Sequence, residues 1–140
     1  MNRRFVSIII VIVAIGAICA GTTVSAQQHR PYNEIMKDVS ATFTSLKKNL
    51  DENSGTPAAD DAAKLQRLFT ETEAFWAPLD TQDAVNFAKR AREAALALGA
   101  AAKGNDIKAA QASYTAIQKS CAGCHFAHRE DTGKGFLIKP

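Results

Sequence analysis

Two cysteines and a histidine near the carboxy terminus constrain this chain more than any other feature. They form the pattern C-x-x-C-H at Cys121, Cys124 and His125, which is typical of covalent haem attachment in exported proteins. Residues three and four positions apart lie on neighbouring parts of one helical face. A helix here would let one haem bond both thiols and accept the imidazole. The pattern therefore predicts one covalently bound haem c per chain, with His125 as the proximal iron ligand.

Two other chemistries use cysteines at this spacing. A thioredoxin-like redox pair accompanies a βαβ pattern, and this chain has no run of residues typical of strands. A zinc site would need Cys121, Cys124, His125 and His128. The side chains of the adjacent residues Cys124 and His125 point about 100° apart on a helix, which disfavours a closed tetrahedral site. Covalent haem is therefore the favoured interpretation.

The first 26 residues have the pattern of a secretory signal peptide. Arg3 and Arg4 precede an apolar run from Phe5 to Ala20, and Val24-Ser25-Ala26 forms a small-residue cleavage site. The run of about 16 residues is shorter than the roughly 20 needed to span a bilayer. The sequence therefore predicts cleavage after Ala26, a periplasmic location and no stable membrane anchor afterwards. A retained anchor is the alternative.

The mature chain predicted in this way has the size of one domain and little net charge. Removing 26 of the 140 residues leaves 114, enough for one compact domain over residues 27–140. The 17 basic residues fall to 15 because Arg3 and Arg4 are lost, while all 14 acidic residues remain, so the net charge is +1. No basic patch with interleaved aromatic residues is present in the sequence. Charge therefore argues against a nucleic-acid partner.

Apolar residues recur at helical spacing in four segments. The first segment, expected over residues 33–53, has its apolar positions three or four residues apart. These positions are Met36, Val39, Phe43, Leu46 and Leu50. The last segment carries the haem motif on its inward stripe, with Ile107, Ala110, Tyr114, Ile117, Cys121, Cys124 and His128. Both stripes predict amphipathic helices packed on a common core.

Breaking and capping residues divide the remaining chain. The second helix is expected to open at Thr56-Pro57, with Thr56 as its cap, and to end before Pro78. Thr81 and Asp106 are expected to cap the third and fourth helices. Four helices of about 20 residues with short loops predict an all-α, antiparallel up-down-up-down four-helix bundle. Residues 136–138 of the tail are expected to pack back on the bundle.

The second axial ligand is predicted from the order of the helices. In this topology the start of the first helix and the end of the fourth lie at the same end of the bundle. Met36, the only methionine of the mature chain, lies at the height of His125. We therefore expect Met36 to bind the iron opposite His125, the alternative being that it only fills the core. Arg129 is expected to shield the imidazole or to pair with a haem propionate.

Together these features resemble the class II cytochromes c, the cytochrome c-prime family. The resemblance rests on C-x-x-C-H near the carboxy terminus of an exported helical domain and on further residues along the chain. These are Gly104-Asn105-Asp106 before an Ala-rich helix, Lys119 to His125 followed by Arg129, and Trp76 with Phe87. The family implies a four-helix bundle, one haem c and a periplasmic location. His128 departs from it, since Phe or Tyr is usual there.

The resemblance also implies a function. Low-spin family members bind the iron with a methionine from the first helix and transfer electrons, and Met36 resembles that branch. We therefore expect an electron-transfer protein with redox partner proteins in the periplasm, which is not an enzyme. The alternative is the five-coordinate branch, which binds nitric oxide or carbon monoxide. A small peroxidase would need a polar distal acid–base group, which the first-helix stripe does not offer. The family also allows a homodimer.

Overall fold

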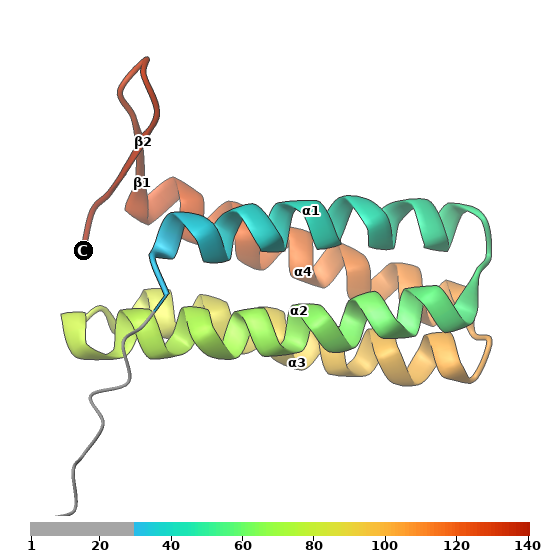
Figure 1. Ribbon diagram of the computed structural model, residues 1–140. Coiled ribbons are helices and arrows are strands. Elements are labelled where there is room, and N and C mark those ends of the chain that lie inside the picture. Colours follow the sequence, from blue (N-terminus) through green and yellow to red (C-terminus); the bar gives the residue numbers. More distant parts are fainter. Residues whose placement is uncertain (1–29) are drawn as a thin grey trace, which may run out of the picture.

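The computed structural model describes residues 30–140, and most of these residues are helical (Figure 1). The four α-helices in this range are α1 (Tyr32–Asp51), α2 (Gly55–Trp76), α3 (Gln82–Lys103) and α4 (Ile107–His128). Each helix runs opposite to the one before it, so the helices form the expected up-down-up-down bundle (Figure 1). Within residues 30–140, no helix is long and apolar enough to cross a membrane. The predicted signal peptide, residues 1–26, lies outside the described residues.

The three turns between helices share one backbone feature. Each contains a single residue with a left-handed conformation, namely Asn53 (φ 54°), Asp80 (φ 54°) and Asn105 (φ 57°). Asn and Asp are the residues other than glycine that adopt this conformation most readily. Between α2 and α3 the chain also passes through η1, a 3₁₀ turn spanning Ala77–Leu79 that contains Pro78. Short turns of this kind place consecutive helices side by side.

The predicted helix caps were right in part. The Asp106 side chain accepts a hydrogen bond of 2.9 Å from the backbone N–H of Ala109, as expected for a cap. Thr81 stands at the cap position of α3, but its hydroxyl donates to the carbonyl oxygen of Leu79 instead. Thr56 is not a cap, because α2 begins at Gly55 and is preceded by Ser54. The first helix is Tyr32–Asp51, so the expected range of 33–53 was shifted by one to two residues.

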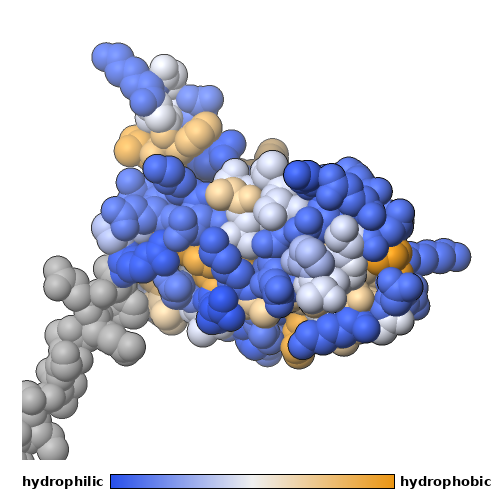
Figure 2. All heavy atoms as spheres, turned by 45° about the vertical axis from the view of Figure 1, so that its right-hand side comes forward, coloured by the Kyte–Doolittle hydropathy of each residue, from blue (hydrophilic) through white to orange (hydrophobic). Residues whose placement is uncertain are grey.

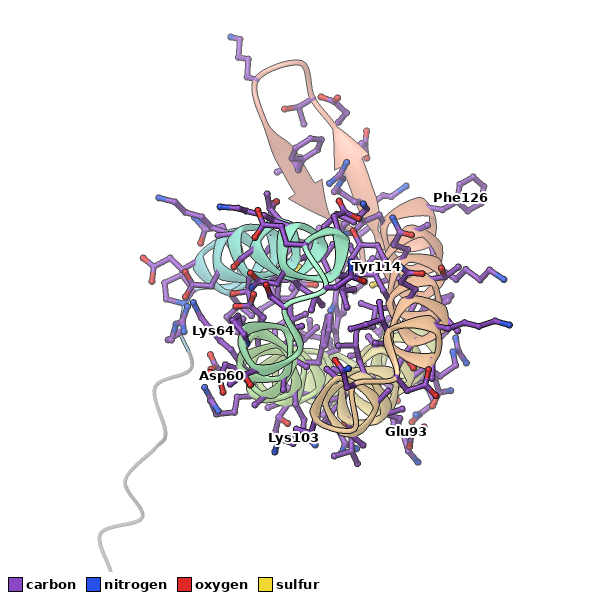
Figure 3. The ribbon with its side chains drawn as sticks, turned by 90° about the vertical axis from the view of Figure 1, so that its right-hand side faces the viewer. Asp60, Lys64, Glu93, Lys103, Tyr114 and Phe126 are labelled. Atoms are coloured by element: carbon purple, nitrogen blue, oxygen red, sulfur yellow. The ribbon has the colours of Figure 1, made fainter. Side chains whose placement is uncertain are left out.

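Small residues bring α2, α3 and α4 close together. The buried alanines are Ala58, Ala59 and Ala62 of α2, Ala84, Ala88, Ala91, Ala95 and Ala102 of α3, and Ala110 of α4. Larger side chains such as Leu65, Leu98 and Ile117 fill the core between them. A view along the bundle shows charged side chains such as Asp60, Lys64 and Lys103 on the outside (Figure 3). This is the distribution that hydrophobic burial favours.

Gly55, the first residue of α2, allows the backbones of α2 and α3 to approach closely. A Cβ atom at this position would lie 2.7 Å from the backbone carbonyl oxygen of Ala102. We expect Gly55→Ala to lower the free energy of unfolding by about 1–3 kcal/mol, because the backbone must shift to relieve the overlap. Urea denaturation measures this. Gly99→Ala is the control, since its Cβ would meet that of Ala62 at an ordinary 3.5 Å. Equal effects of the two substitutions would contradict the packing described.

The stripe predicted for α1 is divided between the core and a neighbouring face. Val39, Leu46 and Leu50 are buried as expected, together with Ile35 and Thr42. Met36 and Phe43 are only half-buried and pack against the edge of the core. At 3.6 residues per turn, positions three residues apart point about 60° apart, so this pair faces a different direction from Val39 and Leu46. The Phe43 ring stacks on Tyr114 of α4, so Met36 and Phe43 face the side of α1 that is nearer to α4.

The tail after α4 differs from the prediction. Residues Arg129–Asp131 form strand β1 and Phe136–Ile138 form strand β2, paired antiparallel with Arg129 opposite Ile138. Phe136, Leu137 and Ile138 are 57%, 60% and 37% exposed. The expected burial of these side chains on the bundle therefore does not occur. Hydrophobic side chains gather at the base of this hairpin, and its tip is hydrophilic (Figure 2). The tight turn at Gly133 (φ 73°) and Gly135 (φ 151°) folds the tail on itself instead.

Candidate functional site

A cavity of about 700 Å³ lies between α1 and α4, at the end of the bundle where α1 begins and α4 ends. It exists because these two helices contact each other far less than the other neighbouring helices do. Its wall includes the apolar side chains of Met36, Val39, Phe43, Phe69, Trp76, Phe87 and Ala88. Several exposed residues also border it, so the cavity reaches the surface. Its size is within the range of sites for small molecules and cofactors, and far above that of a packing defect.

Aromatic side chains define the two ends of the cavity. The rings of Phe43 and Tyr114 stack with centroids 4.2 Å apart and planes inclined by 7°, which joins α1 to α4 at one end. Tyr114 points inward between these helices (Figure 3). At the other end the indole N–H of Trp76 donates to the Tyr32 hydroxyl at 3.0 Å. These two contacts join α1 to α4 and to α2 around the cavity.

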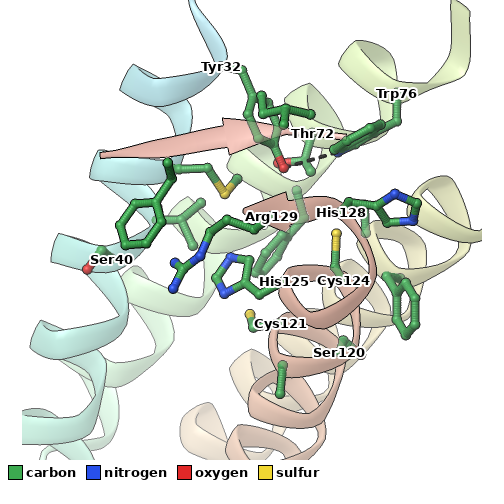
Figure 4. Close-up of a pocket in the computed structure, with 18 of the residues that line it drawn as sticks. Tyr32, Ser40, Thr72, Trp76, Ser120, Cys121, Cys124, His125, His128 and Arg129 are labelled. Atoms are coloured by element: carbon green, nitrogen blue, oxygen red, sulfur yellow. Dashed lines mark hydrogen bonds between the residues drawn. The ribbon is translucent and has the colours of Figure 1, made fainter. Parts of the chain in front are cut away.

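The structure brings together all five residues that the sequence predicted for the site. Cys121, Cys124 and His125 of α4 line the cavity on one side, and Met36 of α1 lines it too. These four side chains are half-buried, and the exposed Arg129 lies at the border. Figure 4 shows the three α4 side chains on the face of the helix turned toward the cavity. Helical spacing and helix order were therefore sufficient to assemble this group.

The electrostatics of the site favour neutral side chains. Burial raises the pKa of both the Cys121 and the Cys124 thiol to about 11, so both are protonated at neutral pH. Burial also lowers the pKa of His125, and the nearby positive charge of Arg129 lowers it further. A neutral imidazole keeps a free lone pair, which is what coordination to a metal requires. His125 is therefore in the form that can act as a ligand.

Arg129 lies where the cavity meets the hairpin. Its guanidinium carbon is 3.8 Å from the centroid of the Phe136 ring, a cation–π contact that fixes the side chain. Figure 4 places the same guanidinium beside the imidazole of His125. This position agrees with the first role expected for Arg129, which is shielding of the imidazole. The exposed guanidinium is equally placed to pair with an anionic group at the cavity border.

Gly123, between the two cysteines, has a packing role that the sequence did not indicate. A Cβ atom here would overlap the ring of Phe87, which approaches from α3. The absent side chain lets Phe87 pack directly against the turn of α4 that carries both thiols. Phe43, Trp76 and Phe87 all line the cavity. Tyr32 also lines it and was not predicted, because it lies just before the range expected for the first helix.

The arrangement of side chains does not favour the zinc alternative. In the part of the chain that the structure describes, no three His, Cys, Asp or Glu side chains are grouped to hold a metal ion. His128, the fourth residue of the hypothetical zinc set, points away from His125 toward α3 (Figure 4). Its two ring nitrogens are already hydrogen-bonded to other groups. The two thiols and His125 thus share the cavity without His128.

Comparison with known proteins identifies no family for this chain. No protein-family model matches the sequence, and no curated protein matches it significantly. The function of this chain is therefore inferred from the site itself.

Proposed function

We propose that this protein binds one haem c in the cavity between α1 and α4 and transfers electrons. The observation that carries the proposal is the meeting of Met36 from the first helix with Cys121, Cys124 and His125 from the last helix in one cavity. Two thiols and an imidazole at C-x-x-C-H spacing form the donor set that covalent haem needs. The apolar lining and the volume of the cavity suit a large planar ligand with a polar edge.

Each of the five residues has a distinct task in this proposal. Cys121 and Cys124 would hold the cofactor through thioethers, while His125 and Met36 would bind its iron. Arg129, at the border of the cavity, would face the polar edge of the ligand. When bound, the haem would supply one-electron transfer between its ferric and ferrous states. The chain would exclude water from the ligand and, through the methionine, raise its potential relative to that with two histidine ligands.

The location and partners follow from the same proposal. We infer export by the segment 1–26 to the periplasm, where covalent haem proteins of this pattern work. The protein would exchange electrons with other redox proteins there and would not itself convert a substrate. A homodimer is allowed but is not required by the bundle, whose apolar side chains are mostly internal.

The absorption spectrum of the purified protein tests electron transfer against gas binding. We expect a low-spin ferric spectrum with the long-wavelength band of thioether-to-iron coordination, and slow or no binding of carbon monoxide after reduction. Both results follow if Met36 occupies the sixth position. A high-spin spectrum with ready carbon monoxide binding would instead support the five-coordinate alternative. In that case Val39 and Phe43, which also line the cavity, would form an apolar wall around the open position.

A further inference from the structure

His128, the last residue of α4, joins three separate parts of the molecule. Its Nε2 atom lies 2.9 Å from the Oδ2 atom of Asp83, in the first turn of α3. Its Nδ1 atom lies 2.8 Å from the carbonyl oxygen of Lys139, just beyond strand β2. The backbone N–H of Lys139 in turn donates to the carbonyl oxygen of His128 at 2.9 Å. We call this group of three residues the clasp.

Both ring nitrogens of His128 face oxygen atoms. A carboxylate oxygen and a backbone carbonyl oxygen can only accept hydrogen bonds, whereas a neutral imidazole has a single N–H to donate. Both bonds together therefore need both ring N–H groups. The hydrogen bond from His128 is the main reason why the pKa of Asp83 lies below its usual range. The Trp76 ring packs beside the imidazole, with the two ring centroids 5.1 Å apart.

The hairpin depends on the clasp for its position. It has only three residue pairs, and a two-stranded ribbon of this length is marginal on its own. Every residue from Arg129 to Pro140 is exposed, whereas His128 is only 9% exposed. Lys139, the residue just after β2, is hydrogen-bonded through both its backbone N–H and its carbonyl oxygen, and both bonds go to His128. The clasp thus joins the carboxy-terminal end of the hairpin to α4 and, through Asp83, to α3.

The base of the hairpin borders the proposed haem cavity. Arg129, Phe136, Leu137 and Ile138 all line it, and the strands pass beside the side chains of α4 that face it (Figure 4). We propose that His128 is a positioning residue, which through Asp83 and Lys139 holds the hairpin over the open side of the cavity and restricts access of small ligands. The clasp itself does not depend on the cofactor. Only its effect on ligand access rests on the proposed function.

Hydrogen exchange of the full mature protein, as purified, tests the clasp. Asp83→Ala removes the carboxylate but creates no core cavity, because the Asp83 side chain is 61% exposed. We expect amides of residues 129–139 to exchange roughly three- to tenfold faster than in the wild type, with helix interiors unchanged. Glu34→Ala is the control, since Glu34 is also an acidic residue in the first turn of a helix, α1, and lies outside the clasp. It should leave exchange in the hairpin unchanged.

A second variant and a second measurement complete the test. His128→Gln cannot bond Asp83 and Lys139 together through one flexible amide, so it should release the hairpin as Asp83→Ala does. With haem bound, both variants should bind imidazole at the ferric iron severalfold faster than Glu34→Ala does. Unchanged exchange of residues 129–139 in both variants would overturn the proposal, and so would an increase spread equally over α1 to α4. A colourless protein would refute the proposed haem, while the exchange result for the hairpin would still decide the clasp.

Discussion

Replacing Met36 by alanine is expected to convert the ferric protein from low spin to high spin and to open the iron to carbon monoxide. Met36 is the thioether that α1 contributes to the cavity, whose α4 side carries His125. The two sulfur atoms that α4 adds, in Cys121 and Cys124, would be committed to the attachment of the proposed haem. Without Met36 the sixth position would be open, because alanine offers no donor atom. The change should be complete, with loss of the long-wavelength thioether band.

Val39→Ala provides the matched control for this substitution. Val39 follows Met36 by one helical turn and lines the same cavity, but it has no donor atom. Its truncation should enlarge the cavity and leave the iron low-spin. Identical spectra for Met36→Ala and the wild type would refute the assignment of Met36 as a ligand. A wild-type protein that is already high-spin would do the same and would support the gas-binding alternative.

Replacing Cys121 and Cys124 together by alanine is expected to abolish covalent attachment. Both thiols line the cavity and are not joined to each other in a disulfide. In the double variant only the axial ligands would hold the haem, so acidified acetone should extract all of the colour from the protein. The wild-type pigment should stay with the polypeptide, and each single variant should keep it through the remaining thioether. Absorbance of the supernatant and of the pellet measures the difference.

Ser120→Ala is the control for the cysteine substitutions. Ser120 precedes Cys121 and lines the same cavity, and its hydroxyl is hydrogen-bonded to the carbonyl oxygen of Ala116 at 3.3 Å. Ser120→Ala removes one side-chain atom beyond Cβ, as each cysteine substitution does, and leaves both thiols in place. Colour that remains with the pellet of the double variant would contradict attachment through Cys121 and Cys124.

The sequence was sufficient to predict the helices and the group of residues in the cavity. The spacing of Cys121, Cys124 and His125 placed three side chains on one face, and the order of four helices placed Met36 at the same end. Both inferences use the regular geometry of helices, which holds wherever a helix forms. Asp106 was recognised as a cap for the same reason, since capping depends on residues close in sequence.

Contacts between residues distant in sequence could not be predicted in this way. The bond of His128 to Asp83 joins residues 45 positions apart, and nothing local to either residue indicates it. Likewise, only the packing of α3 shows that Phe87 lies against Gly123. The hairpin was missed because its strands have three residues each, too few for an alternating pattern to be recognised. Gly133 and Gly135 in its turn were the signal that could have indicated it.

The intact mass of the protein purified from an exporting bacterial host tests the central claim most directly. If Cys121 and Cys124 hold the cofactor, the denatured protein should have the mass of residues 27–140 plus that of one haem. This mass should persist under conditions that remove ligands bound only through the iron. The mass of the bare polypeptide, in a protein that folds with the same helical content, would contradict a covalently bound haem in this bundle.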